Sequence, residues 1–340
     1  MGNNILRYFI CVAVFTCFCL TLSIPNGMGQ DKPLEKASLS IQWLTQCQFA
    51  GYYVALDKGF YKEEGIDLTI IPGASDINPI HLVSSDLADF GTKWLADFLV
   101  ARENTPALIS IAQILQSNGL IMVAKAASGI KIPRDFIGKR LGIWFFGNET
   151  QFFALMNQLD IPLDQLNIDA LKWSIKPFLD GRFDVITAMN YNEYLRILDG
   201  GYEKEALNII DFSEYGLNFP GQVIFTKTDI LEKKPDLCER MVRASLQGWA
   251  WAMNHPEEAV DIVMKYDKTK SLKKDLQLKQ MVAITRLITY GNRPLGYHDP
   301  DQVEFVASRL LEHKVISRPQ ILSEIYTNQV WEKAHAGMEK

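Results

Sequence analysis

The chain has 340 residues, of which 48% are hydrophobic and 22% are charged, and this length exceeds what one hydrophobic core usually serves. The formal net charge is −5 and Lys and Arg form no run, which argues against a nucleic-acid-binding surface because phosphate backbones attract clustered cations. The composition therefore indicates a globular protein, and the length indicates two lobes.

Residues 1–29 are predicted to be a signal peptide. Arg7 supplies a positive start, Tyr8 to Ile24 form an uncharged apolar stretch, and small residues at 27–29 precede an expected cleavage before Gln30. The alternative is an uncleaved anchor helix, although an apolar run of roughly 17 residues is at the short limit for crossing a bilayer. Because Pro25 ends the run, we favour cleavage and expect a periplasmic protein.

Five cysteines bear on the compartment and on metal chemistry. Cys11, Cys17 and Cys19 lie in the signal segment, and neither Cys17 nor Cys19 follows the small residues of a lipid-attachment site. Cys47 and Cys238 remain; a disulfide between them is possible in an oxidising compartment, but separate core cysteines are the more usual outcome. With no CxxC, HExxH or histidine cluster, we expect no metal site.

The first part of the mature chain alternates predicted strands and helices. Apolar residues alternate up to Trp43 as in a strand with one buried face, and a helical pattern follows from Phe49 to Phe60. The later elements are a strand at 66–71, a helix at 81–85 capped by Asp76, a strand at 89–91, a helix at 94–102 and a strand at 107–114. This order predicts a parallel sheet with right-handed crossovers.

A second α/β series follows a strand at 120–125 that leads out of the first lobe. Its predicted elements are strands at 140–145, 168–173, 184–189 and 207–210, with helices at 150–159, 175–179 and 194–198. The chain then returns from Val223 into a mostly helical remainder, broken at His255. We therefore expect lobe 1 to comprise residues 36–124 plus 223–340, and lobe 2 to comprise residues 125–222.

Four segments rich in aromatic and amide side chains each follow a predicted strand: Gln42 to Gln48, Gly91 to Trp94, Trp144 to Glu149 and Asn190 to Tyr194. Ligands of open α/β sheets bind outside the carboxyl ends of the strands. The four segments therefore predict one pocket for a flat polar heterocycle, in a cleft between two lobes that closes by a hinge.

Each candidate side chain also has a structural interpretation. Trp43 and Trp144 are predicted to stack on the ligand, although most tryptophans are core residues and Trp94 is equally suited to starting a helix. The amides of Gln46 and Gln48 suit the edge of a ring, or belong to a solvated loop. The full predicted set is Trp43, Gln46, Gln48, Tyr52, Lys93, Trp94, Trp144, Phe145, Gly147, Asn148, Glu149, Asn190, Tyr191, Asn192 and Glu193.

The polar residues at the starts of the helices predicted at 150–159 and 194–198 also have both a structural and a ligand-binding interpretation. Asn148 has the position of a helix N-cap, and free N–H groups beside it are also suited to a ligand carbonyl or anion. Glu149 is a first-turn partner of the helix dipole or an acceptor for ligand amino groups. Glu193 is favoured as a ligand acceptor, since a carboxylate suits paired donors. For Lys93 an ordinary ion-pair role is favoured.

Phe49 to Ile66 resembles the N-terminal block of the periplasmic binding proteins grouped with thiamine-pyrimidine and sulfonate binders, and Ser84 to Gly91, Trp144 to Glu149 and Asn190 to Tyr194 fit the same NMT1/THI5-like (SsuA/THI5-like) family. The resemblance implies a type II binding-protein fold with a hinge and an interlobe cleft. It also implies the substrate-binding subunit of an ABC importer, with an ABC permease as partner. We expect a monomer without a cofactor or catalytic residues.

Within this family the ligand stays open between a thiamine pyrimidine precursor, such as formylaminopyrimidine or hydroxymethylpyrimidine, and riboflavin. The glutamine-rich segment after the first strand looks more like that of the riboflavin-binding relatives. A sulfonate- or nitrate-type binder is a further alternative, but it would need a basic pocket, and the amide and aromatic segments do not supply one.

One relative in the superfamily is an enzyme, the thiamine pyrimidine synthase, which is thought to use a pyridoxal phosphate lysine, a histidine and a cysteine-rich segment. Lys93 matches that lysine in its local context. Asp97, however, stands where the histidine would be, and Asn218 to Gln222 stand in the region of the cysteine-rich segment. The resemblance therefore favours a binding protein over an enzyme.

Overall fold

The computed structural model describes residues 33–74, 77–145, 149–171 and 174–338. The predicted signal peptide, Asp76, Gly147 and Asn148 lie outside these ranges. No helix within the ranges combines the length and the apolar character needed to cross a membrane.

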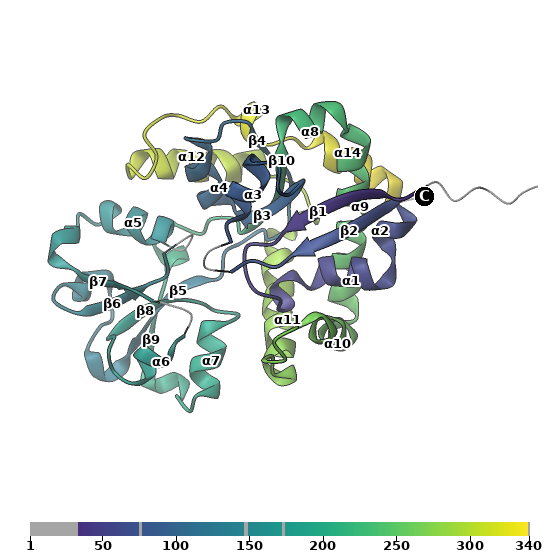
Figure 1. Cartoon of the computed structure of the whole chain (residues 1–340). Helices are drawn as coiled ribbons and strands as arrows, with labels where there is room; N and C mark the ends of the chain where they lie inside the picture. Colours follow the sequence, from purple (N-terminus) through teal and green to yellow (C-terminus); the bar gives the residue numbers. More distant parts are fainter. Residues whose placement is uncertain (1–32, 75–76, 146–148, 172–173, 339–340) are drawn as a thin grey trace, which may run out of the picture. The chain divides into compact units, whose positions relative to one another are not determined.

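The first sheet has five strands in the order β2-β1-β3-β10-β4 (Figure 1). These are β1 (Glu35–Ser40), β2 (Ile66–Ile71), β3 (Phe90–Trp94), β4 (Leu108–Gln113) and β10 (Gln222–Lys227). Strand β1 is parallel to β2 and β3, whereas β10 is antiparallel to both of its neighbours. The prediction of an all-parallel sheet is therefore wrong for one strand, because a segment that returns from far along the chain inserts between β3 and β4.

The second sheet repeats this plan in the order β7-β6-β8-β5-β9. Its strands are β5 (Leu120–Lys125), β6 (Arg140–Ile143), β7 (Asn167–Ala170), β8 (Val185–Met189) and β9 (Leu207–Asp211). The inserted antiparallel strand is β5, which pairs with β8 and β9. The boundary expected at residue 124 therefore falls inside a strand of the second sheet, and the division into lobes starts before Leu120.

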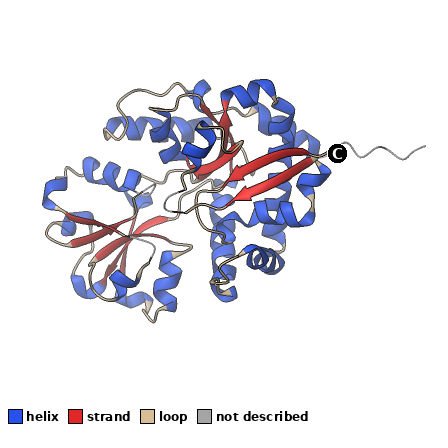
Figure 2. Cartoon of the chain, in the orientation of Figure 1, coloured by secondary structure: helices blue, strands red, loops and turns tan. Residues whose placement is uncertain are grey.

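Helices surround the strands of both sheets (Figure 2). They are α1 (Ala50–Lys58), α2 (Phe60–Glu63), α3 (Pro79–Ser84), α4 (Leu95–Arg102), α5 (Glu149–Gln158), α6 (Lys176–Leu179), α7 (Glu193–Asp199), α8 (Thr228–Lys233), α9 (Pro235–Asn254), α10 (Pro256–Tyr266), α11 (Lys274–Ile288), α12 (Pro300–Glu312), α13 (Leu322–Ile325) and α14 (Gln329–Met338). The predicted break at His255 is confirmed, since Pro256 opens a new helix there.

The contact between α1 and α9 is close because glycines lie on both helices. A Cβ atom on Gly248 would overlap the Gly51 carbonyl oxygen, and one on Gly51 would overlap the Trp249 ring. Trp249 is fully buried and meets Tyr52 edge to face, with 5.7 Å between the ring centroids. This packing fixes α1, and therefore the loop that precedes it, against the longest helix of the described chain.

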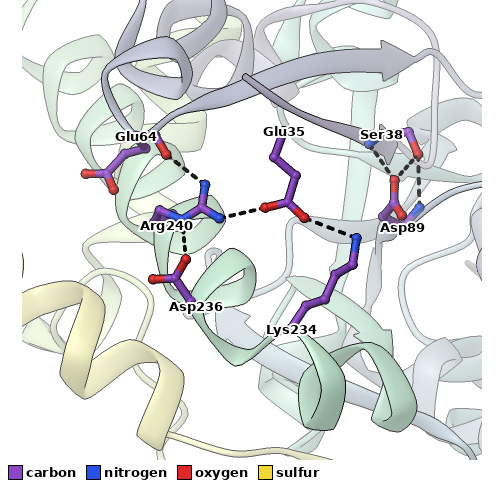
Figure 3. Close-up of polar contacts among 7 residues, drawn as sticks. All are labelled: Glu35, Ser38, Glu64, Asp89, Lys234, Asp236 and Arg240. Atoms are coloured by element: carbon purple, nitrogen blue, oxygen red, sulfur yellow. Dashed lines mark hydrogen bonds and ion pairs between the residues drawn. The ribbon is translucent and has the colours of Figure 1, made fainter. Parts of the chain in front are cut away.

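Arg240 on α9 joins its own helix to the start of β1 and to the turn before β2 (Figure 3). Its guanidinium donates to Asp236 and Glu35 at 2.7 Å and to the backbone oxygen of Glu64 at 2.8 Å. Hydrogen bonding to Arg240, assisted by Lys234, lowers the pKa of Glu35 below its usual value. The network holds the start of β1 and the α2–β2 turn against α9.

Cys47 and Cys238 are both buried free thiols, so the two cysteines do not pair. Burial raises the pKa of the Cys238 thiol to about 12 and that of the Cys47 thiol well above its usual value. Both therefore pack as small apolar core residues.

Two crossing segments connect the sheets, and amide side chains hold them together. Gln113 Nε2 donates to the backbone oxygens of Leu115 at 2.8 Å, Gly221 at 3.2 Å and Gln222 at 3.1 Å. Gly221 N in turn donates to Leu115 O at 2.8 Å. A cross-linked pair of crossing segments restricts the relative motion of the two sheets to a hinge in this region.

Candidate functional site

A cavity of about 840 Å³ lies at the carboxyl ends of strands from both sheets. Six of the predicted site residues line it: Trp43, Gln46, Trp144, Tyr191, Asn192 and Glu193. Its remaining wall comes from α6, α7, the 266–273 loop and α11. No sequence pattern indicates α11 or that loop as part of the site, since their contribution depends on how the C-terminal helices pack.

Trp43 and Trp144 form the aromatic wall predicted for the cavity. The centroids of the two rings lie 5.4 Å apart and their planes are 89° apart, so the rings meet edge to face. Trp43 follows β1 and Trp144 follows β6, so each sheet supplies one ring. A hydrogen bond of 2.9 Å from Trp144 N to Thr187 Oγ1 on β8 holds the second residue in place.

Side chains also hold the later part of β1, and the segment after it, against the first half of β3. Asp89 Oδ2 accepts from Ser38 N at 2.8 Å and from Ser38 Oγ at 2.7 Å (Figure 3). Further along, Thr92 Oγ1 accepts from Gln42 N at 3.0 Å. These contacts bring the segment after β1 alongside β3, as the prediction of a shared edge requires.

The glutamines after β1 are buried rather than solvated. Gln46 is 5% exposed and Gln48 is 2% exposed, and Gln46 Nε2 donates to Gln48 Oε1 at 2.9 Å. Cys47 N, between them, donates to Gln277 Oε1 on α11 at 2.8 Å. The loop is therefore a rigid part of the cavity wall.

A chain of hydrogen bonds that the candidate list lacks lies beneath this loop. Tyr52 OH donates to Gln222 Oε1 at 3.1 Å, and Gln222 Nε2 donates to Gln42 Oε1 at 3.0 Å. Tyr52, which is fully buried, therefore supports Gln42 instead of lining the cavity. Its place beside Trp43 could have indicated Gln42. Its partner Gln222 could not be predicted in the same way, because Gln222 lies on a strand that joins this sheet from a distant part of the chain.

Glu193 has a different role from the one predicted. Its Oε2 accepts from Met189 N at 2.8 Å and its Oε1 accepts from Asn192 Nδ2 at 2.7 Å. Burial raises the pKa of Glu193, while these hydrogen bonds act in the opposite direction. Because both carboxylate oxygens already accept hydrogen bonds, Glu193 fixes the turn between β8 and α7, and its interpretation as the main ligand acceptor loses support.

Lys93 lies beside Asp97 and the start of α5. The Lys93 ammonium is 3.7 Å from Asp97 Oδ2, and Thr150 Oγ1 donates to Asp97 Oδ1 at 2.6 Å. Burial raises the pKa of Asp97 to about 7, although Lys93 opposes this effect. Lys93, Asp97 and Thr150 therefore form a contact between β3, α4 and α5, as the ion-pair interpretation of Lys93 anticipated.

Asp97→Asn is expected to change the pH dependence of stability. Because the folded-state pKa of Asp97 is about 7 and the usual pKa of an aspartate is about 3.8, the folded protein holds this proton more tightly than the unfolded chain. Ionisation of Asp97 therefore lowers the stability as the pH rises between these two values. The stability of the variant relative to the natural protein should therefore be higher at pH 8 than at pH 5. Urea unfolding at both values measures this difference, and an equal difference at both would contradict the assignment.

The other described residues of the predicted set do not line the cavity. Trp94 is 8% exposed, Phe145 packs against the first core, and Asn190 N donates to Gly119 O at 2.7 Å. Glu149 is the first residue of α5. Gly147 and Asn148 stay predictions, since they lie outside the described residues.

The model of the family described as "NMT1/THI5 like" matches residues 46–259, which include the last part of the loop after β1, β3, the whole second sheet and β10. The chain belongs to this NMT1/THI5-like family.

Three relatives of this NMT1/THI5-like protein extend over most of its length. The formylaminopyrimidine-binding protein of Halalkalibacterium halodurans is 21% identical, covering 93% of this chain and 95% of that protein. The riboflavin-binding protein RibY of Chloroflexus aurantiacus is 24% identical, covering 95% of this chain and 96% of that protein.

The third relative carries the name of an enzyme. The 4-amino-5-hydroxymethyl-2-methylpyrimidine phosphate synthase of Legionella pneumophila is 24% identical, with 89% of this chain and 94% of the enzyme covered. Sequence similarity therefore links this NMT1/THI5-like protein both to binding proteins and to a synthase.

Solved structures show the fold. The alkanesulfonate-binding protein SsuA of Xanthomonas axonopodis has a TM-score of 0.67 at 10% identity, covering 87% of this chain and 99% of that protein. The periplasmic nitrate-binding protein NrtA of Synechocystis has a TM-score of 0.66 at 11% identity, covering 90% of this chain and 89% of that protein. The NMT1/THI5-like protein thus has the periplasmic-binding-protein fold, with two α/β lobes.

Proposed function

We propose that this protein is the substrate-binding subunit of an ABC importer and captures a planar nitrogen heterocycle in the 840 Å³ cavity. The observation that carries the proposal is the pair of tryptophans, Trp43 and Trp144, that the two lobes contribute to one cavity. A flat aromatic ligand gains stacking energy of about 1 kcal/mol beyond its buried area from such rings. The ligand is a thiamine pyrimidine precursor or riboflavin, the compounds named for the relatives.

The same proposal includes the cellular setting. The predicted signal peptide and the binding-protein fold support a periplasmic protein that delivers its ligand to an ABC permease. The two lobes and their amide-linked crossing segments support capture by closure of the lobes on the ligand. We propose a monomer, since one chain supplies both walls of the cavity.

The cavity supports an anion-binding function less well. Four cationic side chains line it. Lys176 pairs with Asp180 at 2.6 Å, Lys273 pairs with Asp199 at 2.8 Å, and the charge of Arg196 acts on the Glu193 carboxylate; Lys268 is the fourth. A sulfonate or nitrate site needs cations that the ligand can reach.

The enzyme function is the second candidate, because a relative is named as a synthase and Lys93 matches its lysine in local context. Lys93, however, lies in a buried contact with Asp97, whose Oδ2 is 3.7 Å from the Lys93 amine, so the lysine has a structural role there. Within the described ranges no three His, Cys, Asp or Glu side chains gather as a metal site would require. These observations favour binding without covalent chemistry.

Titration of the purified protein with riboflavin and with 4-amino-5-hydroxymethyl-2-methylpyrimidine tests the proposal. Either ligand is expected to quench or shift the tryptophan fluorescence saturably with one site, because it would lie against Trp43 and Trp144. Mass spectrometry of small molecules released from the protein on denaturation is the parallel measurement. Release of sulfonates alone, with no fluorescence response to either heterocycle, would remove the proposal.

The enzyme candidate is tested separately with pyridoxal phosphate. We expect no absorbance band of an internal aldimine when the cofactor is added. A band that disappears in Lys93→Ala would favour the synthase function instead.

A further inference from the structure

Residues 267–273, the segment between α10 and α11, form part of the cavity wall. All of them except Lys270 line the cavity. Asp267, which is 7% exposed, folds the segment into a turn, because its carboxylate accepts from Thr269 N at 2.9 Å and from Ser271 N at 2.8 Å. These hydrogen bonds within the segment give it a defined conformation beside the cavity.

The last residue of this segment contacts the other lobe. Lys273 Nζ donates to Asp199 Oδ2 at 2.8 Å, and Asp199 is the last residue of α7, the helix that follows β8 of the second sheet. Hydrogen bonding to Lys273 lowers the pKa of Asp199 below its usual value, so the carboxylate is charged at neutral pH. One ion pair therefore connects wall segments that the two lobes contribute to the cavity.

Neither charge of this pair stabilises its own helix. The C-terminal end of a helix carries a partial negative charge, and the N-terminal end carries a partial positive charge. Asp199 adds a carboxylate at the C-terminal end of α7, and Lys273 adds an ammonium group at the residue that precedes α11. The favourable interaction of each residue is with the other, between the two lobes.

The pair lies at the rim of the cavity. The Lys273 side chain is 68% exposed and the Asp199 side chain is 37% exposed, although both residues line the cavity. An exposed ion pair is weak and is screened by salt. Another contact between the lobes, from Thr150 Oγ1 to Asp97 Oδ1 at 2.6 Å, is buried. Of these two contacts, the exposed ion pair opens at the lower cost.

We propose that residues 267–273 are a strap across the rim of the cavity, and that the ion pair of Lys273 with Asp199 latches this strap to the second lobe. Ligand enters and leaves when the pair opens, and the pair slows release when it is formed. The part of the inference that concerns ligand exchange rests on the proposed function, whereas the latch itself is testable without a ligand.

Limited digestion with trypsin tests the latch on the ligand-free protein. The strap contains Lys268 and Lys270, after which trypsin cleaves when the segment leaves the folded surface. Asp199→Asn removes the partner in the second lobe and leaves the sequence of the strap unchanged. Cleavage after these two lysines is expected to be about two- to fivefold faster in the variant, the factor that loss of an exposed ion pair gives. Cleavage at the same rate as in the natural protein would overturn the latch.

Asp261→Asn is the matched control for the digestion. Asp261 on α10 pairs with Lys274, the residue next to Lys273, at 2.5 Å, and both partners of this second pair belong to the first lobe. The control therefore loses an exposed ion pair of the same chemistry and keeps the latch. Its strap should be cleaved at the natural rate. Equal acceleration in Asp199→Asn and Asp261→Asn would show that no specific latch exists.

Stopped-flow fluorescence with riboflavin and with 4-amino-5-hydroxymethyl-2-methylpyrimidine tests the effect on ligand exchange. Release of the probe that binds is expected to be about three- to tenfold faster from Lys273→Glu, because like charges then face each other across the lobes. The double variant Lys273→Glu/Asp199→Lys restores an ion pair of reversed sign and should return the release rate to about the natural value. Lys274→Glu, the control, should release the probe at the natural rate.

The two experiments separate the latch from the proposed function. An unchanged release rate in Lys273→Glu, or no recovery in the double variant, would overturn the role of the ion pair in ligand exchange. Failure of both probes to bind the natural protein would remove the heterocycle proposal, and the digestion of Asp199→Asn would still decide whether the strap is latched.

Discussion

Trp144→Ala is expected to lower the affinity for the heterocyclic ligand about 30- to 150-fold. The substitution removes one of the two rings that form the aromatic wall and leaves Trp43 without its edge-to-face partner at 5.4 Å. Loss of a buried aromatic anchor usually costs about 2–3 kcal/mol of binding free energy, and 1.4 kcal/mol corresponds to a factor of ten. Calorimetric titration with riboflavin, or with the ligand recovered from the purified protein, measures the change.

Trp251→Ala is the matched control for this prediction. Trp251 lies on α9, where its ring stacks on His255 with 4.3 Å between centroids and contacts Lys58, and it does not line the cavity. The affinity of this variant should equal that of the natural protein. A loss of affinity in Trp251→Ala equal to that in Trp144→Ala would mean that both changes act through the fold, and the assignment of the wall would fail.

Gly248→Val is expected to destabilise the protein by about 3 kcal/mol or to prevent its folding. Any Cβ at this position would overlap the Gly51 carbonyl oxygen and crowd Ala55. Neither the backbone oxygen nor the Ala55 Cβ can rotate away, so α1 and α9 would have to separate. Urea unfolding monitored by circular dichroism measures the loss.

Gly337→Ala provides the control within a helix of the same lobe. A Cβ atom on Gly337 would meet the guanidinium end of the Arg243 side chain, which donates to Ala334 O and to Glu64 Oε2 but can shift as backbone cannot, and alanine is the better helix former. This variant should lose much less free energy of unfolding than Gly248→Val. If Gly248→Val proved as stable as Gly337→Ala, the close approach of α1 and α9 would be wrong.

Local patterns predict much of this fold. The bounds of β2, from Ile66 to Ile71, agree with the prediction at both ends because Gly65 and Pro72 punctuate an apolar run. The break at His255 follows from Pro256 in the same way. The segments that follow the strands are predicted to lie close together. Trp43 and Trp144, which follow strands of different sheets, do contact each other.

Long-range pairing defeats the same reasoning. Nothing near β5 or β10 indicates that each inserts antiparallel between two strands, since that choice depends on residues far away in sequence. The hydrogen-bond partners of individual side chains cannot be predicted from the sequence either. Glu193 looks like a ligand acceptor in the sequence, but the turn between β8 and α7 uses both of its oxygens. Gln42 belongs to the first of the four segments but not to the predicted site residues, and its amide is oriented by Gln222.

The insertion of β10 also has a consequence for the order in which parts of the chain can fold during synthesis. Strand β4 ends at Gln113 and β10 begins only at Gln222, so β3 and β4 have no neighbour between them until the second sheet has emerged. Unpaired strand edges invite pairing with other chains, and distant pairings form slowly. We therefore expect a chain truncated before Gln222 to aggregate instead of yielding an isolated first lobe.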